Sequence, residues 1–65
     1  MNCQRCEIAR AKVIARTMIL VGKSLDEIAM YLTNLYHVTY FVDKDIIYRS
    51  NNPVNRIIYS RSNRR

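Results

Sequence analysis

The chain has 65 residues, of which 49% are hydrophobic and 25% are charged, a composition typical of one small globular domain. This length excludes a large enzyme. Eleven lysine and arginine residues against five acids give a formal net charge of +6 at pH 7, which favours a polyanion such as nucleic acid as the partner. Charged residues interrupt the longest apolar segment and no secretory signal begins the chain, so we expect a cytoplasmic protein without a membrane span.

The charge is divided unevenly along the chain. Residues 1–23 carry a balance of +4 and residues 24–45 a balance of −3, whereas five arginines and no acid follow from residue 46 onward. Eight of the eleven cations are arginine. The planar guanidinium group of arginine can bind phosphate, or pair with guanine, through two N–H donors. The two basic ends are therefore the candidate segments for binding a polyanion.

The first half of the chain predicts two helices. Apolar residues recur at spacings of three and four over residues 3–21, which is typical of an amphipathic helix, and Gly22 then stands where helices commonly end. Ser24 and Glu27 have the spacing of a capping box, so a second helix should begin at Leu25 and stop near Asn34.

The next segment is compatible with either type of secondary structure. Residues 35–42 are rich in aromatic and β-branched side chains, which allows a strand. Thr39 can instead cap a helix over residues 40–49, in which Val42 and Ile46 would face the core. We favour the helix.

The last segment is also open to two interpretations. The break at residues 50–53 ends in Asn-Pro, a pair that often opens a helix, whereas the apolar run within residues 56–60 allows a strand. With a short fourth helix here, the expected fold is an all-α domain of three to four helices, of the helix-turn-helix type. It would span residues 1–65, with a basic C-terminal extension over about residues 53–65.

Neither metal binding nor catalysis is expected. Cys3 and Cys6 have the spacing of half a zinc site, but only His37 could add a third ligand of the usual kind. We therefore interpret them as two ordinary thiols at the start of a helix, with a bound metal or a contact between chains as the alternative. The sequence shows no nucleophile arrangement around His37 and no glycine-rich phosphate loop, so we expect no cofactor and no enzyme activity.

Residues 23–29 (KSLDEIA), together with residues 42–46 (VDKDI) and the later Asn52-Pro53, resemble the stage III sporulation protein D family of bacterial DNA-binding regulators. The similarity covers roughly residues 8–60. It implies a helix-turn-helix that reads the major groove and a basic C-terminal helix that adds contacts outside it. The candidate base contacts are Thr39, Tyr40, Phe41, Asp43 and Lys44. The candidate phosphate contacts are Lys23, Arg49, Arg56, Arg61, Arg64 and Arg65.

The sequence therefore predicts a small transcriptional regulator that binds double-stranded DNA. The alternative is a small phage or mobile-element protein that binds and modulates a host protein, because tyrosine and arginine also dominate protein interfaces. The five tyrosines suit either partner. Small basic regulators often act as dimers. The sequence shows no recognisable dimer interface, so a homodimer is an alternative to the monomer.

Overall fold

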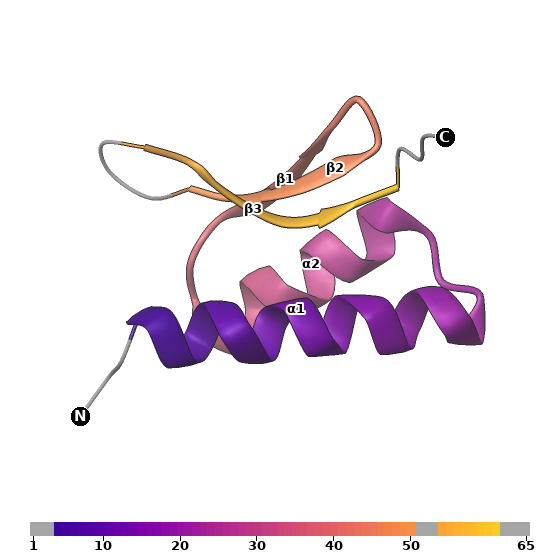
Figure 1. The fold of residues 1–65 in the computed structure, drawn as a ribbon, viewed down its shortest axis with the longest axis horizontal. Coiled ribbons are helices and arrows are strands. Elements are labelled where there is room, and N and C mark those ends of the chain that lie inside the picture. The colour runs from indigo at the N-terminus through magenta and orange to yellow at the C-terminus, as the bar shows by residue number, and fades with distance from the viewer. Residues whose placement is uncertain (1–3, 51–53, 62–65) are drawn as a thin grey trace.

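The computed structural model describes residues 4–50 and 54–61. Their elements, in chain order, are α1 (Gln4–Val21), α2 (Leu25–Tyr36), β1 (Tyr40–Asp43), β2 (Ile46–Arg49) and β3 (Arg56–Ser60). The strands form one antiparallel sheet in the order β1-β2-β3, and Figure 1 shows both helices on the same side of it. The expected all-α fold is therefore wrong, and the domain is of the α+β class.

The two helices predicted in the first half of the chain are confirmed. Gly22 ends α1 with a φ of 104°, and the N–H of Lys23 donates to the carbonyl of Met18 at 2.9 Å, as in a Schellman motif. At the start of α2, the N–H of Glu27 donates to Ser24 Oγ at 3.2 Å, and the N–H of Ser24 donates to Glu27 Oε1 at 3.1 Å. The capping box thus forms as expected.

The third helix, expected over residues 40–49, is wrong. The segment is a hairpin of β1 and β2 in which Lys44 and Asp45 form the turn with φ values of 52° and 64°. Two consecutive left-handed residues make a two-residue turn of the I′ kind, whose twist suits paired strands. The aromatic and β-branched residues on both sides of the turn then pair as strands, so residues 40–49 contain no recognition helix.

The short fourth helix is also wrong, because the described part of the basic extension forms strand β3. This strand pairs with β2, and the register shifts between Ile47 and Tyr48. Tyr59 therefore lies opposite Ile47 and Ile57 opposite Tyr48, which leaves Ile58 as the extra residue of a β-bulge, with 4% of its surface exposed. Residues 62–65 lie outside the described part of the chain.

The core fills the space between the helices and the inward face of the sheet. Ala11 and Ala15 are completely buried in α1, where their small side chains allow neighbouring elements to approach closely. The largest fully buried side chains are Ile28 and Leu32 of α2 and Ile47 of β2. Helix α2 packs against β1, and α1 packs against the edge strand β3.

Candidate nucleic-acid interface

A cluster of three polar side chains, of which two are buried and Glu7 is partly buried, joins α1 to the sheet. Arg49 donates from Nε to Glu7 Oε2 at 2.7 Å and from Nη2 to Glu7 Oε1 at 3.2 Å, and the Tyr40 hydroxyl donates to the same carboxylate. Tyr40 and Arg49 are register partners in β1 and β2, with exposed fractions of 5% and 8%. The cluster therefore holds the first turn of α1 beneath the first two strands.

The charges in this cluster stabilise one another. The hydrogen bond from Arg49 lowers the pKa of Glu7, although partial burial acts in the opposite direction. The same bond raises the pKa of Arg49. The pKa of Tyr40 is raised mainly by burial and further by its hydrogen bond to Glu7. At neutral pH the ion pair is complete and the phenol keeps its proton, so the cluster has a structural role.

The structure separates the residues expected to contact bases. Tyr40 points inward to Glu7, whereas the next residue, Phe41, lies on the outward face of the sheet. Thr39 is exposed in the α2–β1 connection, and its carbonyl accepts the N–H of Ser50 at 2.9 Å. Asp43 and Lys44 are exposed at the β1–β2 turn. These residues do not share one helix face.

The residues expected to contact phosphate are divided as well. Arg49 is bound to Glu7 in the interior, whereas Lys23 is exposed in the α1–α2 connection. Arg56 and Arg61 are exposed at the two ends of β3. Arg64 and Arg65 lie outside the described residues.

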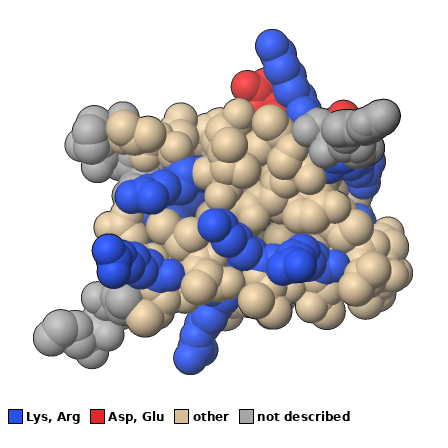
Figure 2. All heavy atoms as spheres, viewed as in Figure 1, with Lys and Arg blue, Asp and Glu red and all other residues tan. Residues whose placement is uncertain are grey.

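A basic surface instead combines β3 with α1. Arg5, Lys12 and Arg16 are exposed at positions i, i+7 and i+11 of α1, a spacing that places them on one side of the helix. Because α1 packs against β3, these cations lie near the arginines of that strand, and Figure 2 shows several basic side chains spread over this face of the molecule. We call this surface the basic face, and its residues are Arg5, Lys12, Arg16, Arg56 and Arg61.

Acidic side chains do not neutralise the basic face. Within residues 4–50 and 54–61, none of its five cations forms an ion pair. Glu7 forms an ion pair with Arg49, and the other acids lie at the start of α2 or beside the β1–β2 turn. In the view of Figure 2, acidic side chains appear only near the upper edge of the molecule. The positive potential of this face is therefore left uncompensated by the described protein groups.

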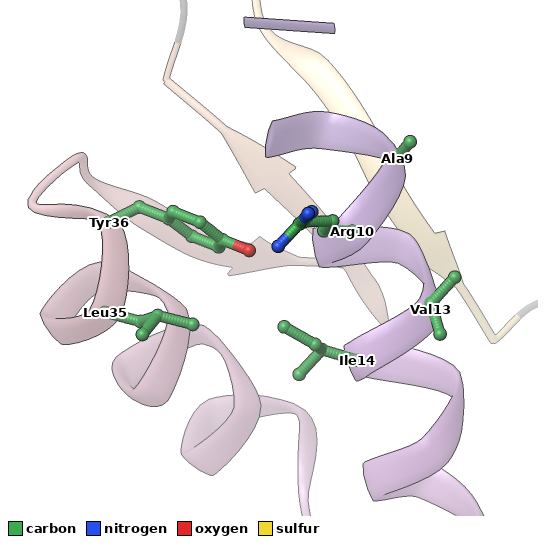
Figure 3. Close-up of a pocket in the computed structure, with 6 residues that line it drawn as sticks. All are labelled: Ala9, Arg10, Val13, Ile14, Leu35 and Tyr36. Atoms are coloured by element: carbon green, nitrogen blue, oxygen red, sulfur yellow. The ribbon is translucent and has the colours of Figure 1, made fainter. Parts of the chain in front are cut away.

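A groove of about 580 Å³ lies between α1 and α2, and most of its lining is apolar. Figure 3 shows the side chain of Arg10 and the hydroxyl of Tyr36 directed toward one another across it. Its lining residues are Ala9, Arg10, Val13, Ile14, Leu35 and Tyr36. Arg10 thus lies on a different side of α1 from Arg5, Lys12 and Arg16.

The described residues offer no metal centre, since they contain no cluster of three or more histidine, cysteine or acidic side chains suited to a metal ion. Cys6 is an exposed thiol, and Cys3 lies outside the described range. His37 ends α2 in a left-handed conformation, with a φ of 59°. In the part of the chain that is described, no helix is long and apolar enough to span a bilayer.

No family model matches this sequence, and no curated protein or solved structure is significantly similar to it. The resemblance to the sporulation regulators therefore stays a prediction, and the recognition helix that it implied is replaced by strands.

The cations of α1 were missing from the phosphate contacts expected from the sequence. The sequence shows that residues 1–23 are basic, but the helix-turn-helix interpretation places the phosphate contacts in the later helices and the basic C-terminal extension. The sequence does contain a signal for them, because Arg5, Lys12 and Arg16 follow one another at spacings of seven and four residues, which places them on one side of a helix.

Proposed function

We propose that the protein binds nucleic acid and that the basic face contacts its phosphates. The observation that carries this proposal is the gathering of five exposed cations, four of them arginine, on adjoining surfaces of α1 and β3, with no acidic partner among the residues that the structure describes. Guanidinium groups form strong, charge-assisted hydrogen bonds with phosphate oxygens. A net charge of +6 also steers the protein toward a polyanion over longer distances.

This mode of binding differs from that of a helix-turn-helix. A strand hairpin follows α2, so the proposal includes no helix inserted into the major groove. Contacts to phosphate supply affinity and fix orientation, but they carry no sequence information by themselves. The basic face therefore accounts for binding that depends on the charge of the backbone.

The salt dependence of binding tests this proposal. Affinity for labelled random-sequence oligonucleotides, single-stranded and duplex, is measured by fluorescence anisotropy at several salt concentrations. Each phosphate that the protein neutralises should contribute about −0.7 to the slope of log affinity against log salt for a single strand and about −0.9 for a duplex. Five contacts would give slopes of about −3.5 and −4.5.

Arg16→Ala and Arg10→Ala form a matched pair, because both remove one exposed arginine from the same helix. Arg16→Ala should make the slope shallower by about 0.7 to 0.9, since it removes one phosphate contact. Arg10→Ala should leave the slope unchanged, because Arg10 lines the groove between the helices. Equal effects of the two variants, or no binding at low salt, would contradict the proposal.

A further inference from the structure

The outward face of the sheet carries a row of large apolar side chains. Both helices lie on the opposite face, and no described element packs on the outward one (Figure 1). The register places Phe41 opposite Tyr48 and Tyr48 opposite Ile57, so these three residues follow one another across β1, β2 and β3. They alternate with Tyr40 and Ile47, which are buried on the inward face.

The two aromatic rings of this row form a stacked pair. Their centroids are 5.4 Å apart and their planes differ by 23°. Phe41 and Tyr48 are half-buried, and 52% of Ile57 is exposed. An antiparallel sheet with one solvated face normally carries polar side chains there. An aromatic row on that face is instead the arrangement with which sheet domains bind unpaired bases.

An arginine stands at each end of β3, the strand that carries Ile57. Strand β3 is an edge of the sheet, with Arg56 at its first residue and Arg61 directly after its last. Five residue-to-residue steps of extended chain place these two arginines about 17 Å apart. The sugar–phosphate backbone of a nucleic acid that follows this edge could contact both arginines while its bases extend over Ile57 toward Tyr48.

These charges favour nucleic acid over other occupants of the outward face. A second copy of this chain would bring another net charge of +6 to the same surface, which is repulsive. Unpaired bases expose π-faces that stack on aromatic rings, whereas the bases of a duplex are already stacked on one another. An oligonucleotide supplies both a negative charge for the arginines of the edge strand β3 and flat apolar surfaces for the aromatic row.

We propose that this face binds single-stranded nucleic acid, with bases stacked on Phe41 and Tyr48 and phosphates on Arg56 and Arg61. This inference rests on the proposed function, because it assigns the type of nucleic acid and the surface that contacts the bases. The cations of α1 offer further phosphate contacts, so the bound nucleic-acid strand can continue along the basic face.

Tyr48→Leu and Tyr31→Leu form a matched pair that tests the stacking. Both remove a tyrosine ring and keep an apolar side chain, but Tyr31 is an exposed residue of α2, on the other side of the sheet. Tyr48→Leu should weaken binding of single-stranded oligothymidine by about 5- to 150-fold. Tyr31→Leu should leave this affinity unchanged, and neither substitution should change the salt slope.

Phe41 gives a second measurement that needs no variant. It is the only phenylalanine in the chain, so fluorophenylalanine incorporation yields one fluorine resonance from the proposed stacking surface. This resonance should shift saturably with single-stranded oligothymidine and change much less with duplex at the same phosphate concentration. Absence of a shift on a bound single strand would overturn the inference.

The outcomes separate the two proposals. If neither single strand nor duplex binds at low salt, the proposed function fails and the inference fails with it. If both bind with steep salt dependence but Tyr48→Leu behaves like Tyr31→Leu, only the base-stacking inference is overturned. A fluorine signal that depends on protein concentration without nucleic acid would assign this face to self-association, and it too would overturn the inference.

Discussion

Glu7 and Arg49 lie 42 positions apart in the sequence, yet Arg49 Nε is 2.7 Å from Glu7 Oε2. The exposed fractions of the two side chains are 17% and 10%. Because Glu7 belongs to the first turn of α1 and Arg49 ends the central strand, this ion pair sets how the basic helix lies against the sheet. The position of the basic face thus depends on a largely buried pair that contributes no binding charge itself.

Removal of one partner of this pair should destabilise the fold. We expect Glu7→Ala to lower the free energy of unfolding by about 3 kcal/mol, because Arg49 would stay buried without a counter-charge. Asp26→Ala is the control, since Asp26 is exposed in the first turn of α2 and should cost less than about 1 kcal/mol. Urea unfolding measures both variants, and equal losses would contradict this role of Glu7.

The same pair predicts a dependence of stability on pH. Arg49 lowers the pKa of Glu7 from its ordinary value of 4.5, so the folded state favours the carboxylate. The stability gained is complete above the pKa of the unfolded carboxyl group and is lost as the pH falls through the lower pKa of the folded state.

Urea unfolding of the wild type and of Glu7→Gln between pH 7 and pH 3 measures this contribution. The difference in unfolding free energy should be constant above about pH 5 and should shrink at lower pH. A difference that grows as the pH falls would show that the pair does not favour the ionised carboxyl group.

The β1–β2 turn predicts a stabilising double substitution. Lys44 and Asp45 both have positive φ, and Asn-Gly is the pair most favoured in a two-residue turn of this kind. We expect Lys44→Asn with Asp45→Gly to raise the free energy of unfolding by about 1 kcal/mol. In a helix the introduced glycine would instead cost about 1 kcal/mol, so the sign of the change distinguishes the hairpin from the helix expected from the sequence.

Local signals made the two helices predictable. The apolar spacing in α1, the position of Gly22 and the capping box of Ser24 and Glu27 each act within a few residues, and each is present in the structure. Residues 40–49 misled the prediction because Thr39 and the spacing of Val42 and Ile46 also fit a capped helix. The turn pair Lys44-Asp45 lacks the glycine or asparagine that usually marks a hairpin.

The candidate interface depended on contacts that no local pattern encodes. The sequence showed two basic ends, but only the packing of α1 against β3 brings Lys12 and Arg16 beside Arg56. The inward position of Arg49 was equally hidden, because its partner Glu7 belongs to the opposite end of the chain. Net charge therefore predicted the class of partner, whereas tertiary packing determined which cations remain exposed to it.

The most direct test of binding through the basic face is a titration of the nitrogen-15-labelled protein with an oligonucleotide, followed by NMR. We predict saturable shifts for the backbone amides of α1 around Lys12 and Arg16 and for those of β3, with the groove residues Leu35 and Tyr36 of α2 much less affected. Shifts centred on the groove between α1 and α2, or no shifts at low salt, would contradict it.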